Sequence, residues 1–149
     1  MEAEPREIQD YLTPDGNSPF TSWLEALRDI AVLTWVQYIK NLWNRRWTQM
    51  NADEVVPDSD ENRYIQARAK IRNRLKRVES GNLGNYRSVG EGVCELKVDY
   101  GSGYRVYFGQ IGTTVILLLC GGDKSTQEQD INKAKEYWKD YEKRASTSK

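Results

Sequence analysis

Hydrophobic and polar positions follow two different periods along this chain. Over residues 93–108 apolar and charged side chains alternate on both sides of Gly101-Ser102-Gly103, which is typical of a β-hairpin with one buried face. Residues 115–120 are apolar at every position, as in a strand covered on both faces. Residues 6–12 are predicted to form a further short strand.

Three other segments carry apolar residues at helical spacing. The first follows Ser18-Pro19, a serine N-cap before a proline, and the second spans residues 63–78. The third begins at Ser125, where Ser125-Thr126-Gln127-Glu128 fits a capping box. The order β-α-(insert)-α-β-β-β-α predicts an α+β fold, with helices packed on a small, mostly antiparallel sheet, in a single domain of residues 1–149.

Residues 30–62 form an atypical insert between the first two helices, an aromatic helix followed by an acidic loop. The insert contains Trp35, Trp43 and Trp47, three of the 5 tryptophans. Three interpretations are open: a helical extension that packs on the body, an aromatic surface that binds a partner, or an insertion that has disabled the protein. The first is favoured, because aromatic residues at helical spacing more often serve packing than recognition.

The net charge of zero hides a division along the chain. Residues 1–62 hold five Lys and Arg against twelve Asp and Glu, whereas residues 63–149 hold seventeen against ten. A basic body with a segregated acidic segment suggests an anionic partner. A solvated charged face is the ordinary alternative.

Composition also narrows the chemistry and the location. The chain has no histidine, which excludes nucleophiles activated by histidine, and Cys94 and Cys120 lack the spacing of metal ligands or redox pairs. No metal and no cofactor are therefore expected.

The acidic start lacks the apolar run of a signal peptide, and the longest apolar stretch is about half of a bilayer span. These features predict a cytoplasmic protein with no membrane partner.

The polar face of the hairpin is the most informative feature for function. With a three-residue turn, Asp99 is predicted to pair with Arg105 and Lys97 with Tyr107, all on one face. Lys124 and Gln127 should arrive nearby, at the end of a strand and the start of the last helix. Two cations, a phenol and a helix N-terminus can bind a phosphodiester. The alternative is a simple cross-strand ion pair between Asp99 and Arg105.

A site of this kind can cleave RNA without a metal. Guanidinium and ammonium groups stabilise the negative charge of the phosphorane and protonate the leaving oxygen. Lys97 or Glu95 is the candidate base that takes the proton of the 2′-hydroxyl. Arg68, Arg72 and Arg74 on the second helix are candidate RNA contacts, with a solvated or partner-binding face as the alternative.

Several stretches of the sequence follow one another in the order seen in a known family. They are Asp10-Tyr-Leu-Thr-Pro-Asp-Gly-Asn-Ser-Pro-Phe20, Trp23-Leu-Glu-Ala-Leu27, Lys70-Ile-Arg-Asn-Arg-Leu75, Gly81-Asn-Leu-Gly84, Val89-Gly-Glu-Gly-Val93, Gly103-Tyr-Arg-Val-Tyr-Phe-Gly-Gln110, Leu118-Leu-Cys-Gly-Gly-Asp-Lys-Ser125 and Ala134-Lys-Glu-Tyr-Trp138. Through them the chain resembles the RelE/HigB-type toxins of type II toxin–antitoxin systems, also known as addiction module killer proteins. Relatives lack the long insert after the first helix.

This resemblance implies a microbial-ribonuclease-like (RelE-like) fold and a metal-independent endoribonuclease that cleaves mRNA, typically on the ribosome. It also implies neutralisation by a cognate antitoxin, often a helix-turn-helix protein. Arg105 matches the family's phosphate-stabilising arginine, and Lys97 and Lys124 match basic active-site positions. Tyr107 or Gln127 would stand in for an aromatic acid found in some relatives. The alternative is a non-catalytic RNA- or antitoxin-binding protein of the same fold, inactivated or repurposed by the insert.

Overall fold

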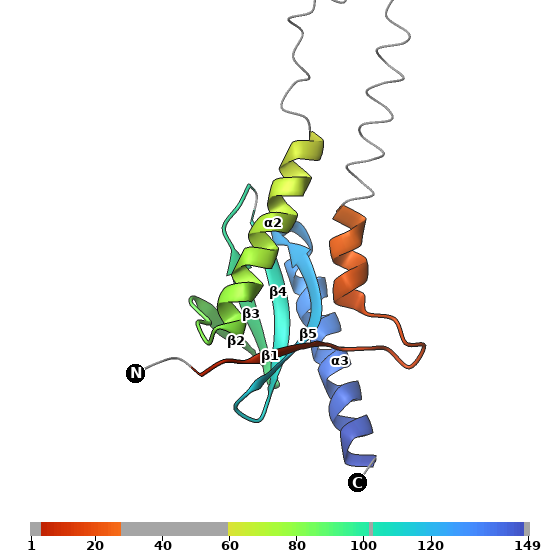
Figure 1. Ribbon diagram of the computed structural model, residues 1–149. Helices are drawn as coiled ribbons and strands as arrows, with labels where there is room; N and C mark the ends of the chain where they lie inside the picture. Colours follow the sequence, from red (N-terminus) through yellow and green to blue (C-terminus); the bar gives the residue numbers. More distant parts are fainter. Residues whose placement is uncertain (1–3, 28–59, 102, 148–149) are drawn as a thin grey trace, which may run out of the picture.

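A five-stranded mixed sheet with helices on both faces forms the body of the protein (Figure 1). The structure, a computed structural model, describes residues 4–27, 60–101 and 103–147. The strand order is β1-β5-β4-β3-β2, with β1 parallel to β5 and every other pair antiparallel. The strands are β1 (Glu7–Asp10), β2 (Tyr86–Gly90), β3 (Val93–Val98), β4 (Tyr104–Ile111) and β5 (Val115–Asp123). The prediction of an α+β fold with a mostly antiparallel sheet is thus confirmed.

One face of the sheet packs against helix α2 (Asp60–Glu79), which lies in front of the sheet in Figure 1, and against the helical residues 19–27, drawn in orange to the right of β5. Alternate residues of β3 and β4, such as Leu96 and Val106, point to this face because strand side chains alternate. They meet an apolar stripe on α2 that includes Ile71 and Val78. This core lies on the side away from the candidate site.

The opposite face packs against helix α3 (Gln127–Thr147). Trp138 lies over the backbone of β4, so close that a Cβ at Gly109 would come within 2.2 Å of its ring. Gly109 therefore permits an approach that any side chain would block. Leu119 and Ala134 also belong to this second core. The core lies where α3 covers the strands.

The predicted hairpin forms with a different register. Lys97 pairs with Arg105 and Val98 with Tyr104, whereas pairs of Asp99 with Arg105 and Lys97 with Tyr107 were expected. The prediction was wrong because the loop is longer than the three residues assumed, and Asp99 lies outside the strand. The shift is two residues, so Lys97 and Arg105 still share a face.

Strand β2 was not predicted. Its burial pattern is almost wholly exposed, so it lacks the apolar alternation that indicates a strand. It pairs with β3 through the turn Gly90-Glu91-Gly92, where Gly90 and Gly92 have φ values of 96° and 86°. Left-handed backbone at these positions is why the turn contains glycine.

Two predicted helix starts have different outcomes. Ser18 caps the first helix as predicted, since its Oγ accepts a hydrogen bond of 3.1 Å from the backbone of Thr21. Ser125 is not the cap of the last helix. Asp123 accepts from the backbone of Ser125 and caps a short 3-10 helix, η2 (Lys124–Thr126), which leads into α3.

The aromatic helix and most of the acidic loop of the insert, predicted for residues 30–62, lie outside the described residues. The loop was expected to extend to residue 62, but α2 already begins at Asp60. Among the described residues, no helix combines the length and the apolar character needed to cross a membrane.

Candidate functional site

A cavity of about 480 Å³ opens on the α3 side of the sheet, beyond the point where α3 begins. We call it the Arg105 cavity. Its lining comes from the residue before β2, from β2, β3 and β4, and from the first residue of α3: Asn85, Tyr86, Arg87, Glu95, Lys97, Arg105 and Gln127. Three of these are cations and one is a carboxylate, so the cavity is basic. Polar strand residues reach it because α3 does not extend over this end of the strands.

Arg105 is the least satisfied group in the cavity. Its side chain is 11% exposed, and its Nε lies 3.6 Å from Oε1 of Glu95, too far for a hydrogen bond. Nε and Nη1 are both buried, and no described residue accepts a hydrogen bond from either. Buried donors without acceptors cost about 1–3 kcal/mol each, so a native protein rarely keeps them without a use. A guanidinium that lines a basic cavity, with Nε and Nη1 lacking a hydrogen-bond acceptor among the described residues, fits the oxygen atoms of a phosphate.

Glu95 holds the cations of the cavity together. Arg87 donates from Nε to its Oε1 at 2.9 Å, and Gln127 donates from Nε2 to its Oε2 at 2.9 Å. Burial raises the pKa of Glu95, but hydrogen bonds from Arg87 and Gln127 outweigh burial, so the pKa lies below its usual value. Glu95 is therefore ionised at neutral pH, and its oxygens are occupied. This makes it a poor proton acceptor and a good anchor for Arg87 and Arg105.

Tyr107 lies beneath this cluster. Its side chain is fully buried, and its Oη has no hydrogen-bond partner of good geometry among the described residues. Burial, followed by the charge of Glu95, raises the pKa of Tyr107 well above that of a free tyrosine. The phenol stays protonated and does not line the cavity.

The structure brings together some of the residues expected at the catalytic site and separates others. Arg105, Lys97 and Gln127 line one cavity, with Lys97 also 3.5 Å from Asp99 in an exposed ion pair. Lys124 is exposed in η2 and does not line the cavity. It nevertheless lies at the same end of the sheet, since Gly122 pairs with Arg105.

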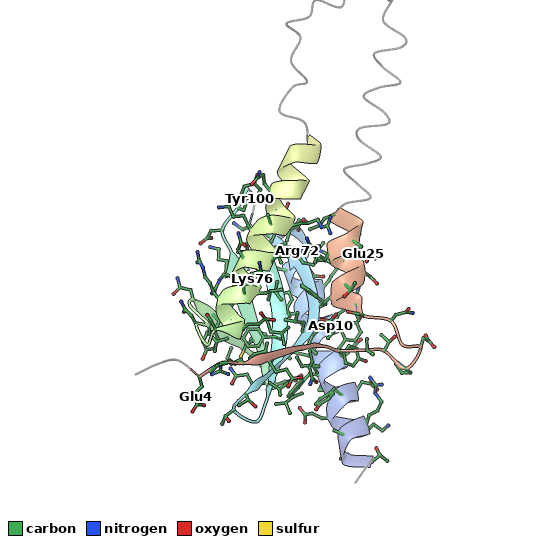
Figure 2. The ribbon with its side chains drawn as sticks, in the orientation of Figure 1. Glu4, Asp10, Glu25, Arg72, Lys76 and Tyr100 are labelled. Atoms are coloured by element: carbon green, nitrogen blue, oxygen red, sulfur yellow. The ribbon has the colours of Figure 1, made fainter. Side chains whose placement is uncertain are left out.

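The expected RNA contacts on α2 have three different environments. Arg74 donates hydrogen bonds to the carbonyls of Leu83 and Asn85, which fastens the loop after α2. Arg72 is exposed on α2, where Figure 2 labels it. Arg68 is partly buried, and its Nε has no hydrogen-bond partner in the part of the chain that the structure describes.

Arg87 is the site residue that sequence reasoning missed. It stands opposite Glu95 in the β2–β3 ladder, and its position depends on a strand that was not predicted. The available signal was Gly90-Glu91-Gly92, a glycine-rich turn directly before the alternating residues of β3.

Within residues 4–27, 60–101 and 103–147, no group of three or more cysteines or carboxylates is arranged to hold a metal ion. What the described cavity offers is two guanidinium groups, one of them buried, together with an exposed ammonium, two amides, a phenol and one carboxylate.

The fold and this cavity define a small α+β protein in which a buried guanidinium opens into a basic cavity. No protein-family model matches the chain. A protein of Haemophilus influenzae, described as uncharacterized, is 51% identical over 71 residues, which make up 48% of this chain and 72% of that protein. The chain therefore belongs to the same family as that H. influenzae protein. The description of that protein states no activity.

Proposed function

We propose that this protein is a RelE/HigB-type toxin of a type II toxin–antitoxin module, with a microbial-ribonuclease-like fold. Its activity is metal-independent cleavage of mRNA, at the ribosome. The observation that carries the proposal is the buried guanidinium of Arg105, whose Nε and Nη1 have no hydrogen-bond acceptor among the described residues, in a cavity that Lys97 also lines. The sequence motif around Arg105 supports the same function.

In the proposed reaction, the ribose 2′-hydroxyl attacks the adjacent phosphorus. The bond from phosphorus to O2′ forms, the bond to O5′ breaks, and a 2′,3′-cyclic phosphate and a 5′-hydroxyl result. Arg105 stabilises the charge that develops on the phosphoryl oxygens. Lys97, which lines the cavity, assists proton transfer: its ammonium gives a proton to O5′ as the bond breaks, and the proton of the 2′-hydroxyl passes to water.

Two other residues have supporting roles in the proposal. Glu95 is a positioning residue, since it faces Arg105 while Arg87 and Gln127 occupy its oxygens. Lys124 contributes positive charge at the rim for a longer RNA, because it is exposed and lies outside the cavity lining. An antitoxin, a helix-turn-helix protein in this proposal, would neutralise the toxin as a partner protein.

The test is induced expression in bacteria with mapping of cut transcripts. We expect the wild-type chain to arrest growth and to leave transcripts with new 5′ ends. Arg105→Lys keeps the charge but loses the planar fork, and should lower the cleavage rate about 100- to 1000-fold, the usual effect of losing a group that stabilises the transition state. Circular dichroism and denaturation of the purified variant show whether it remains folded.

Lys139→Gln is the control, because it removes one positive charge from an exposed ion pair with Glu91 outside the cavity. Cleavage that Arg105→Lys leaves unchanged would remove Arg105 from the site.

The rival function is a non-catalytic RNA- or antitoxin-binding protein of the same fold. The observation that favours it is that both carboxylate oxygens of Glu95 already accept hydrogen bonds, from Arg87 and Gln127, so Glu95 is a poor base. This rival function predicts no growth arrest and no cut transcripts, but stable co-purification with a partner.

A further inference from the structure

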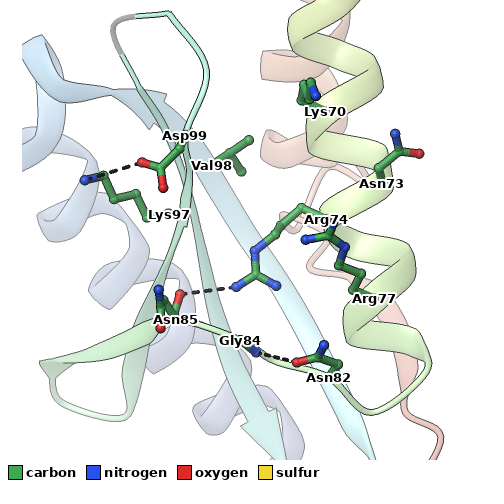
Figure 3. Close-up of a pocket in the computed structure, with 10 residues that line it drawn as sticks. All are labelled: Lys70, Asn73, Arg74, Arg77, Asn82, Gly84, Asn85, Lys97, Val98 and Asp99. Atoms are coloured by element: carbon green, nitrogen blue, oxygen red, sulfur yellow. Dashed lines mark hydrogen bonds and ion pairs between the residues drawn. The ribbon is translucent and has the colours of Figure 1, made fainter.

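A second basic cavity lies between α2 and β3, and the residues of α2 that line it have no role in the proposed reaction. We call it the α2 cavity; its volume is about 530 Å³. Figure 3 shows its lining: Lys70, Asn73, Arg74, Arg77, Asn82, Gly84, Asn85, Lys97, Val98 and Asp99. Four of these are cations, one is a carboxylate and only one is apolar. The first four lie at helical spacing on α2, where a polar stripe faces a cavity instead of the core.

Among the described residues that line the α2 cavity, cations outnumber carboxylates by four to one. Arg74 reaches from α2 toward Asn85, whose carbonyl accepts from its Nη2 at 3.2 Å (Figure 3). Burial, followed by the neighbouring charge of Arg77, lowers the pKa of Arg74. Asp99 is the one carboxylate of the lining, and it pairs with Lys97 at 3.5 Å. An anion bound here would relieve the repulsion between the arginines.

The two cavities meet at the edge of β3. Asn85 and Lys97 line both of them. The ladder between β2 and β3 ends where Tyr86 pairs with Leu96, so Lys97 lies just past the end of β2. A chain molecule can therefore pass from one face of the sheet to the other at this point, in contact with Lys97 throughout.

The lining indicates the kind of polymer that fits. Interfaces with proteins are apolar at their centre, whereas those with nucleic acids are more polar and more positively charged. The α2 cavity has one apolar residue, Val98, among ten. A duplex is too stiff to turn around the edge of one strand, but a single strand is not.

We propose that the α2 cavity is a second phosphate-binding subsite, where single-stranded RNA held by Arg105 continues around the edge of β3 to Lys70, Arg74 and Arg77. The identity of the polymer rests on the proposed function. The location of the subsite rests on the shared lining of the two cavities. A dinucleotide has one internucleotide phosphate and cannot place a phosphate in both cavities, so tight binding requires a longer strand.

The test measures the binding of 2′-O-methyl RNA, which this chemistry cannot cleave, by fluorescence anisotropy over a range of salt concentrations. Lys70→Gln combined with Arg77→Gln removes two cations of the α2 cavity. For an octanucleotide, the slope of log Kd against log salt should become smaller by about 1.4, the contribution of two phosphate contacts on a single strand. For a dinucleotide the slope should not change.

Lys76→Gln combined with Lys139→Gln is the matched control. It also removes two exposed cations, one of them next to Arg77 in the last turn of α2 (Figure 2), but neither lines either cavity. This control should keep the wild-type slope. Equal changes in the two double variants would overturn the subsite, and so would equal competition by a glutamate-rich peptide of the same charge.

The outcomes separate this inference from the proposed function. If the wild-type chain arrests growth but Lys70→Gln with Arg77→Gln leaves the slope unchanged, the subsite is wrong and the toxin function stands. If the slope changes as expected but no transcript is cut, the subsite stands and the nuclease function is wrong. Failure of the wild-type chain to bind the octanucleotide would overturn the subsite.

Discussion

The sheet face that α3 covers has an apolar end and a charged end, although β3 and β4 form both. Successive pairs on this face are Val93 with Gly109, Glu95 with Tyr107, and Lys97 with Arg105. Trp138 closes over the first pair, whereas α3 has not yet begun above the last one. Alternation in a strand decides which face a residue occupies. The starting point of the covering helix then decides whether that residue joins a core or a site.

The largest effect on stability is expected at the apolar end. Trp138→Ala removes a ring that is 8% exposed and lies on Gly109, so the free energy of unfolding should fall by about 3–5 kcal/mol. Urea denaturation measures this. Trp138→Phe keeps part of the ring and should lose less. A loss below about 1 kcal/mol for the alanine variant would mean that this end of the face is not the anchor of α3.

A smaller effect of opposite sign is expected at the charged end. Arg105→Met removes a buried guanidinium whose Nε and Nη1 lack a hydrogen-bond acceptor among the described residues, while Glu95 keeps its bonds with Arg87 and Gln127. The free energy of unfolding should rise by about 1 kcal/mol, and activity should be lost, since replacing a poorly satisfied buried ion by an apolar side chain is often stabilising. Paired denaturation and cleavage assays test this. A stability loss as large as that of Trp138→Ala would make Arg105 a structural residue and erase the contrast.

The smallest effect concerns the pH dependence of stability. The pKa of Glu95 is lower in the folded protein than its usual value, so its contribution is present above the unfolded pKa of about 4.3 and is lost as pH falls through the folded pKa. Glu95→Gln should therefore flatten the decline in stability as pH falls below about 5. Denaturation at several pH values measures it. Glu142→Gln, an exposed glutamate on α3, should keep the wild-type profile.

The difference between the apolar end and the charged end of this sheet face also explains which parts of the site the sequence could predict. Alternation correctly placed Lys97, Arg105 and Tyr107 on one face, because the period of a strand survives a shift of two residues. It could not predict that Tyr107 is buried and Lys97 exposed, since both depend on where α3 begins. The placement of Lys124 outside the cavity depends on the cap at Asp123, a local hydrogen bond that competes with the predicted capping box.

The strand that carries Arg87 shows a second limit of sequence reasoning. Exposed edge strands such as β2 bury little, so their composition resembles that of a loop. Only the glycine turn before β3 indicated a hairpin. The fold class was predictable because burial of β4 and β5 leaves a strong apolar pattern, whereas edges and site residues are selected for other properties.

The parallel pairing of β1 with β5 has a consequence for biosynthesis. Glu7 finds its partner only when Val115 has been made, whereas the hairpin of β3 and β4 needs nothing that comes later in the chain. During translation the ladder that carries Glu95 and Arg105 can thus form before the N-terminal edge is in place. Closure of that edge is the late, non-local step, and such steps are the slow ones in folding.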